Sequence, residues 1–132
     1  MELEKKDIET RKDIQLLVDT FYAKAREDEL IGPIFNGVIK DKWPEHLEKL
    51  YRFWETVLLY KRSYRGSPFM PHSKLPIKKE HFDQWLKLFQ ETLDEHFTGK
   101  IADDAKWRSE KMAEMFQFKL EYYQGTDKKP LL

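Results

Sequence analysis

The chain contains no cysteine among its 132 residues. This absence excludes disulfides, metal sites with thiolate ligands and cofactor attachment through a Cys-x-x-Cys-His motif. No stretch approaches the roughly 20 consecutive apolar residues that a membrane-spanning helix needs. Residues 1–6, Met-Glu-Leu-Glu-Lys-Lys, contain no apolar stretch, so they lack the apolar region of a signal peptide. We therefore expect a cytoplasmic protein without a membrane partner.

An excess of charge of either sign is also missing, because 24 basic residues balance 24 acidic ones. Nucleic acids select proteins with a basic surplus, so we expect no nucleic-acid partner. The five glycines are isolated from one another, and no Gly-rich phosphate loop or Gly-x-Ser-x-Gly nucleophile motif occurs.

Aromatic residues, in contrast, are abundant: nine Phe, six Tyr and four Trp make up 14% of the chain. Each buried ring removes about 150–250 Å² from water. The composition indicates either an aromatic-rich core or a core that also lines a slot for a flat apolar ligand, and composition alone leaves both interpretations open.

Apolar residues recur at steps of three and four in four stretches, about residues 10–28, 42–60, 78–97 and 103–123. Thr10 and Asp13 resemble a capping box at the first of these helices. Gly32-Pro33 predicts its end, followed by a turn over residues 34–37, and Gly99 and Gly125 predict the ends of the last two helices. No strand pattern occurs. We predict an all-α fold with one domain over residues 1–132, a core from about residue 10 to 123, and a loose C-terminal tail.

The four histidines limit the possible metal chemistry. None follows a glutamate by three residues, as a di-iron bundle requires, and none has a second histidine four residues away, as a zinc-protease helix requires. His81 and His96 lie about four turns apart on one predicted helix, too far to share a metal ion. Neither a ferritin-type site nor a mononuclear zinc site is expected.

Two histidines remain, His46 on the apolar flank of a helix and His72 in a proline-bounded segment over residues 63–76. They could approach a planar group from opposite faces. Haem fits such an arrangement, since its iron takes a neutral imidazole and its macrocycle needs an apolar slot. His72 is the better candidate for the proximal ligand, because the flanking prolines restrict its backbone. The residues alone leave open that His72 belongs to an ordinary surface loop.

Four segments, in unbroken order over about residues 10–123, resemble the truncated haemoglobins, group III in particular. They are Phe21-Tyr22 with Leu30-Ile31-Gly32-Pro33-Ile34-Phe35-Asn36, then Trp43-Pro44-Glu45-His46-Leu47-Glu48-Lys49-Leu50 through Phe53-Trp54, then Pro71-His72-Ser73-Lys74-Leu75-Pro76, and Phe82-Asp83-Gln84-Trp85-Leu86-Lys87-Leu88-Phe89. The glycine pairs of groups I and II are missing, which agrees with group III. The resemblance implies a truncated globin fold, a helical sandwich around one non-covalent haem b.

The resemblance also implies site residues. His72 would ligate the iron, and Tyr22, His46 and Trp85 would line the distal side, where ligands bind. Lys49 could pair a haem propionate or simply be solvated. The remaining wall of the slot would consist of Phe35, Phe53, Trp54, Leu75 and Phe82.

Such a site would bind O₂, CO and NO, and possible further ligands are cyanide and peroxide. Tyr22 can donate an O–H and Trp85 an N–H to bound O₂, which would slow its release. Two alternatives stay open: an enzyme with nitric oxide dioxygenase or peroxidase-like activity, which would need a reductase partner, and a haem-free helical interaction module. We expect a monomer, although the sequence does not determine the oligomeric state.

Overall fold

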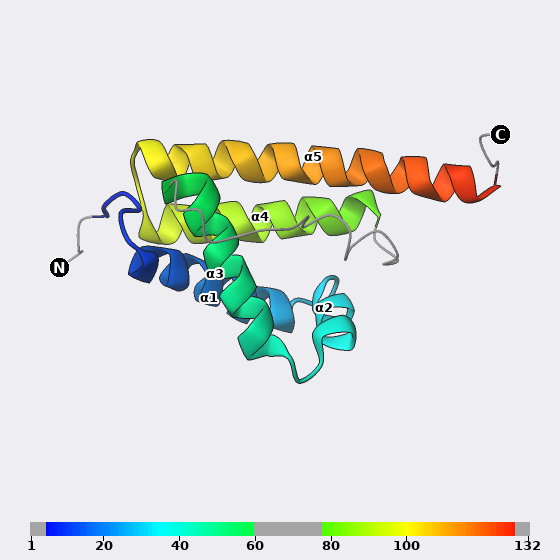
Figure 1. The fold of residues 1–132 in the computed structure, drawn as a ribbon, viewed down its shortest axis with the longest axis horizontal. Helices are drawn as coiled ribbons and strands as arrows, with labels where there is room; N and C mark the ends of the chain where they lie inside the picture. Colours follow the sequence, from blue (N-terminus) through cyan, green and yellow to red (C-terminus); the bar gives the residue numbers. More distant parts are fainter. Residues whose placement is uncertain (1–4, 60–77, 129–132) are drawn as a thin grey trace.

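The computed structural model describes residues 5–59 and 78–128, and it describes side chains as far as residue 119. Its helices are α1 (Arg11–Glu27), α2 (Gly32–Ile39), α3 (Trp43–Leu59), α4 (Lys79–His96) and α5 (Lys100–Lys128). Helices α4 and α5 lie side by side and antiparallel, α3 crosses them, and α2 lies beyond the end of α1 (Figure 1). Within these residues the only β-type pairing is an isolated bridge between Lys6 and Phe97. The all-α prediction is confirmed.

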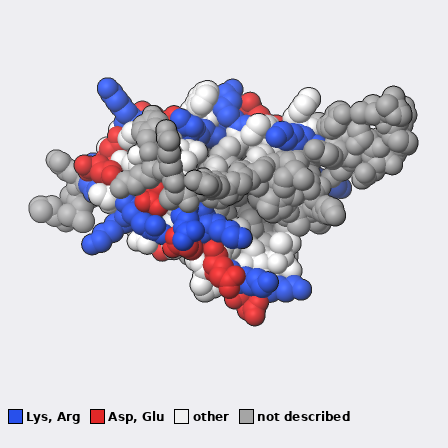
Figure 2. Space-filling model, viewed as in Figure 1, with Lys and Arg blue, Asp and Glu red and all other residues white. Residues whose placement is uncertain are grey.

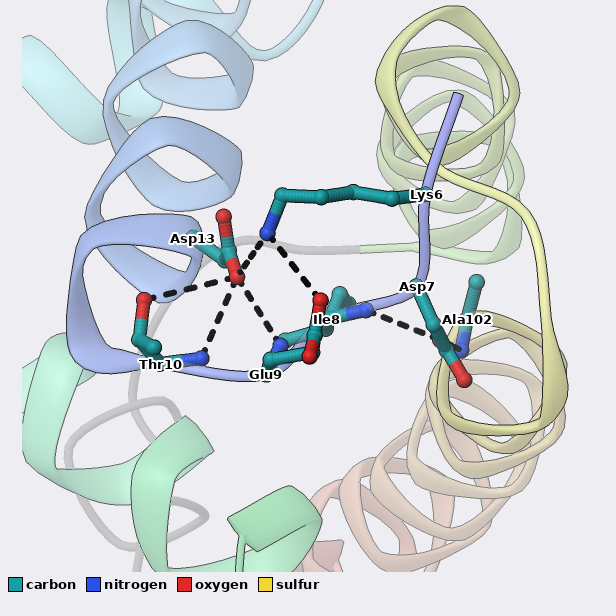
Figure 3. A network of polar contacts seen from close by, with 7 residues as sticks. All are labelled: Lys6, Asp7, Ile8, Glu9, Thr10, Asp13 and Ala102. Atoms are coloured by element: carbon teal, nitrogen blue, oxygen red, sulfur yellow. Dashed lines mark hydrogen bonds and ion pairs between the residues drawn. The ribbon is translucent and has the colours of Figure 1, made fainter. Parts of the chain in front are cut away.

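Helix α1 begins with the predicted capping box. The Asp13 carboxylate accepts the backbone N–H of Thr10 at 3.1 Å and that of Glu9 at 2.9 Å, and the Lys6 ammonium lies 2.8 Å from the same oxygen (Figure 3). Burial acts to raise the pKa of Asp13, but these contacts outweigh it and hold the pKa below its usual value. The carboxylate is therefore ionised and stabilises the start of α1.

The same N-terminal segment caps α5, which is distant in sequence. The two carboxylate oxygens of Asp7 accept the backbone N–H groups of Ile101 and Ala102, both at 2.9 Å. Next to them, the carbonyl of Lys6 accepts the N–H of Thr98 at 3.0 Å. Free N–H groups at a helix start need acceptors, and a negative charge there is favourable. This explains why α5 begins three residues before the predicted helix at residue 103.

The core forms where aromatic rings of α1, α3 and α4 meet. Phe21 of α1 lies edge-on to Phe89 of α4, with ring centres 5.3 Å apart. Phe89 in turn stacks on Trp54 of α3 at 5.0 Å and on Trp85 of α4 at 5.3 Å. Because Phe21, Trp54 and Phe89 are at most 3% exposed, this stack joins three helices in one apolar core.

The predicted turn over residues 34–37 is wrong, because these residues belong to α2. Pro33 lies in the first turn of that helix, where the missing N–H costs nothing. Before the helix, the Asp28 carboxylate accepts the N–H groups of Leu30 and Ile31, both at 2.9 Å, and so stabilises the turn between α1 and α2. A Cβ on Gly32 would lie 2.6 Å from the carbonyl oxygen of Arg26, so glycine is required at this close approach.

Two further expectations about the chain's second half need correction. Gly125 does not end α5, which continues to Lys128. Met115, which belongs to the apolar repeat predicted over residues 103–123, is 45% exposed instead of buried. The segment over residues 63–76 lies outside the described residues. Among those that are described, no helix is long and apolar enough to cross a membrane.

Gly99 provides a test of the link between Asp7 and α5. Its φ of +134° is a conformation that other residues rarely adopt, and a Cβ there would lie 2.5 Å from Cγ of Asp7. We expect Gly99→Ala to lower the free energy of unfolding by about 2 kcal/mol, because it strains the backbone and displaces the cap. Urea denaturation measures this.

The matched control for Gly99→Ala is Gly37→Ala in α2, where nothing lies within 4 Å of the added Cβ. There alanine should raise stability by about 0.5–1 kcal/mol, since it favours helix. If both substitutions changed the free energy of unfolding equally, Asp7 would not be stabilising the start of α5 as described.

Candidate functional site

Tyr22 of α1 stands at the centre of a cluster of rings, which we call the Tyr22 cluster (Tyr22, Phe35, Trp43, His46 and Trp85). The ring of Tyr22 lies 5.5 Å from Phe35 of α2, 5.7 Å from Trp43 and 5.8 Å from His46, both of α3. All three contacts are steeply inclined, which is the favoured geometry for such pairs. Tyr22 itself is only 8% exposed, so its hydroxyl is enclosed by protein.

Trp85 of α4 completes the cluster through a polar contact. Its indole N–H is near enough to the hydroxyl oxygen of Tyr22 to act as a donor to it. Burial raises the pKa of Tyr22 well above its usual value, because the phenolate would lose hydration, and the Trp85 N–H opposes this to a lesser extent. Tyr22 therefore keeps its proton. With Trp85 serving as a donor to the oxygen, the O–H of Tyr22 can itself donate to another group.

His46 turns inward at the first turn of α3. Its Nε2 atom is buried, and its ring lies edge-on to Tyr22 and Trp43, with ring centres 5.8 Å away in both cases. The structure thus brings together Tyr22, His46 and Trp85, the three residues that the resemblance assigned to the distal side. They come from three different helices.

An apolar stripe continues from His46 along α3. Leu50, Phe53 and Val57 follow at steps of four, three and four residues, and all are only half-buried. Large apolar side chains are more often fully covered in a core. A flat apolar molecule lying along this side of α3 would cover them, so these residues fit a group such as haem.

The other predicted site residues are dispersed. Phe35 belongs to the Tyr22 cluster, and Trp54 lies in the core on Phe89 with Phe53 beside it at 5.2 Å. Phe82 packs in a smaller cluster with Ala113 and Phe116, and Lys49 is exposed on α3. His72 and Leu75 lie outside the described residues. In the part of the chain that the structure describes, no group of His, Asp and Glu side chains could hold a metal ion.

Sequence reasoning missed two members of this region, Trp43 and Arg26. Trp43 is 6% exposed and borders both Tyr22 and His46, and the Arg26 guanidinium covers its ring at 4.4 Å from the ring centre. A signal was present. Trp43 lies three residues before His46, and Arg26 lies four residues after Tyr22. Such spacings place Trp43 on the same helix face as His46, and Arg26 on the same face as Tyr22.

Three comparisons with known proteins agree. The family model described as bacterial-like globin matches residues 6–120. The group 3 truncated haemoglobin ctb of Campylobacter jejuni is 36% identical over 119 residues, which cover 87% of this chain and 94% of that protein. The crystal structure of a group III truncated haemoglobin from Campylobacter jejuni superposes with a TM-score of 0.81 at 35% identity and covers 89% of this chain and 95% of the other.

These matches span nearly the whole chain and extend from sequence to three-dimensional structure. The truncated globin fold is therefore confirmed, and the family assignment favours a haem protein over a haem-free interaction module. The chain belongs to the bacterial-like globin family, to its group III truncated haemoglobins, and is a haem-binding, gas-binding protein of that general kind.

Proposed function

We propose that this globin binds haem b without a covalent link, with His72 as the iron ligand, and holds O₂ and related diatomic gases beside Tyr22, His46 and Trp85. The observation that carries the proposal is the Tyr22 cluster: a protonated, buried hydroxyl within contact of an indole N–H and an imidazole. When bound, haem supplies an iron coordination position at which a diatomic ligand gains partial negative charge.

The polar groups of the cluster match such a ligand. The Tyr22 hydroxyl donates toward the ligand, while the Trp85 N–H holds the Tyr22 oxygen and polarises its O–H. His46 adds a third polar group from α3. The apolar rings around them exclude water, which strengthens each hydrogen bond.

The remaining predicted wall residues would serve as the resemblance implies. Phe35 and Phe53 would contact the macrocycle, and Trp54, Leu75 and Phe82 would support it. Lys49, exposed on α3, would pair a propionate.

A site that releases O₂ slowly is better suited to reaction than to transport. Retained O₂ has time to meet nitric oxide, and the same pocket suits peroxide. Repeated turnover would need a reductase to return the iron to the ferrous state.

The first prediction concerns His72. We expect the purified protein to show a Soret band that shifts when carbon monoxide is added to the reduced form. His72→Ala should lose or alter this band, because the iron loses its imidazole. The matched control is His96→Ala, which removes an imidazole at the end of α4 and should leave the spectra unchanged. A colourless protein that ignores added haemin would overturn the proposal.

The second prediction separates the roles of Tyr22 and Trp85. Tyr22→Phe should speed O₂ dissociation about tenfold to a hundredfold, since a charge-assisted hydrogen bond contributes about 1.5–3 kcal/mol. Trp85→Phe should also speed it, but should have little further effect when Tyr22 is already Phe, because Trp85 acts through the Tyr22 oxygen. Stopped-flow measurement of the O₂ dissociation rate for the natural protein, the two single variants and the double variant completes this double-mutant cycle. Independent, multiplying effects would show instead that Trp85 donates directly to the ligand.

The third prediction concerns pH. An exposed tyrosine titrates near pH 10, whereas burial raises the pKa of Tyr22 above that value. The donor should therefore persist on the alkaline side, and the ratio of O₂ dissociation rates between Tyr22→Phe and the natural protein should stay constant from about pH 7 to 10. If the natural protein accelerated toward the variant's rate over this range, Tyr22 would be ionising and the burial argument would be wrong.

A further inference from the structure

Helix α5 carries apolar side chains on two opposite faces. One face packs against α4 through small residues and one ring, with Ala102, Ala105, Ala113 and Phe116 at most 7% exposed. On the other face, Trp107 is 56% and Phe118 is 70% exposed. An amphipathic helix of a monomer normally has one apolar face. The second apolar face of α5 therefore needs an explanation.

The exposed side chains form an ordered row, which we call the α5 stripe (Trp107, Lys111, Glu114 and Phe118). Steps of four, three and four residues place all four on one side of the helix. The Lys111 ammonium lies 6.0 Å from the centre of the Trp107 ring and 3.5 Å from the Glu114 carboxylate. Met115, which is 45% exposed, flanks the stripe.

Other exposed large apolar residues of the described chain are not arranged in this way. Leu16, Leu30 and Val38 come from α1, from the turn after it and from α2. On the face shown in Figure 2, acidic and basic side chains are interspersed, so this face presents no field of one sign to a partner. A partner that binds the α5 stripe would therefore be selected by the order of apolar and charged side chains along the stripe.

Along the helix the order is an apolar residue, a cation, an anion and an apolar residue. When a second copy of this row runs in the opposite direction, apolar side chains meet apolar ones and each cation meets an anion. If two copies of α5 lie antiparallel about a two-fold axis between residues 112 and 113, Trp107 faces Phe118 of the partner subunit. Lys111 then faces Glu114 of the partner subunit, and each contact occurs twice. We propose that the α5 stripe is the docking surface for a second copy of this chain, with the two α5 helices antiparallel. Such a contact is isologous and closes at two copies.

The size of the stripe sets the strength of this contact. From Trp107 to Phe118 the helix rises about 17 Å, which is short for an interface that should bury about 800 Å² on each partner. The dimer is therefore weak and depends on protein concentration, and a dilute solution contains mostly monomer. The contact involves no residue of the Tyr22 cluster, so it is independent of the proposed function.

Charge reversal tests both the partner and the register. In Lys111→Glu the dimer brings four acidic groups together, and in Glu114→Lys it brings four basic groups together. We expect each variant alone to dimerise about tenfold more weakly than the natural protein, since two exposed pairs change sign. An equimolar mixture of the two variants pairs acidic with basic side chains, as does the double variant K111E/E114K, and both should regain the natural affinity. Sedimentation equilibrium from micromolar to millimolar concentration measures this.

The matched control uses the exposed ion pair Lys79–Asp83 of α4, where Lys79→Glu and Asp83→Lys should leave dimerisation unchanged. Circular dichroism checks that every variant keeps its helix content. A natural protein that stays monomeric at millimolar concentration would overturn the proposal. So would a dimer that ignores the Lys111 and Glu114 reversals, or a variant mixture that fails to recover.

Discussion

The rest of the structure depends on the burial of α1 from more than one side. Phe21 and Tyr22 are consecutive residues, so their side chains leave the helix about 100° apart, yet they are 1% and 8% exposed. Phe21 faces the rings of Phe89 and Trp85, and Tyr22 faces those of α2 and α3. The apolar core and the candidate site therefore lie on two sides of the same helix. A change in packing around Phe21 would affect Tyr22, because the two residues are neighbours in one turn of α1.

This arrangement explains how a polar site can exist within so small a core. A buried hydroxyl without a partner would cost about 1–3 kcal/mol. Trp85 can reduce that cost, because its N–H is near enough to donate to Tyr22 while its own ring stacks on Phe89. One residue thus serves both sides of α1. Trp43 supports the Tyr22 side: its ring packs against both Tyr22 and His46 and is covered by the Arg26 guanidinium.

The sequence predicted the helices whose apolar repeats are long and regular, and these became α1, α3 and α4 within a few residues. It failed at α2, because proline and glycine usually mark a turn, whereas here Pro33 lies in the first turn of a helix, where its missing N–H costs nothing. It also failed to separate the two apolar faces of α5, since spacing cannot say which face a neighbour covers. The meeting of Tyr22, His46 and Trp85 followed from family resemblance rather than from periodicity, because contacts between distant helices leave no local pattern. The roles of these residues, and that of His72, stay predictions.

The Asp7 carboxylate has a consequence for the order in which the protein is made. Asp7 leaves the ribosome early, but the N–H groups of Ile101 and Ala102 that it caps follow 94 and 95 residues later. At a synthesis rate of about 5–20 residues per second, the N-terminal segment waits roughly 5–20 seconds for its partners. During that interval Asp7 has no helix to cap, and the contact between Lys6 and Thr98 cannot form. The fold can therefore be completed only late in synthesis, when the first residues of α5 become available to contact the N-terminal segment.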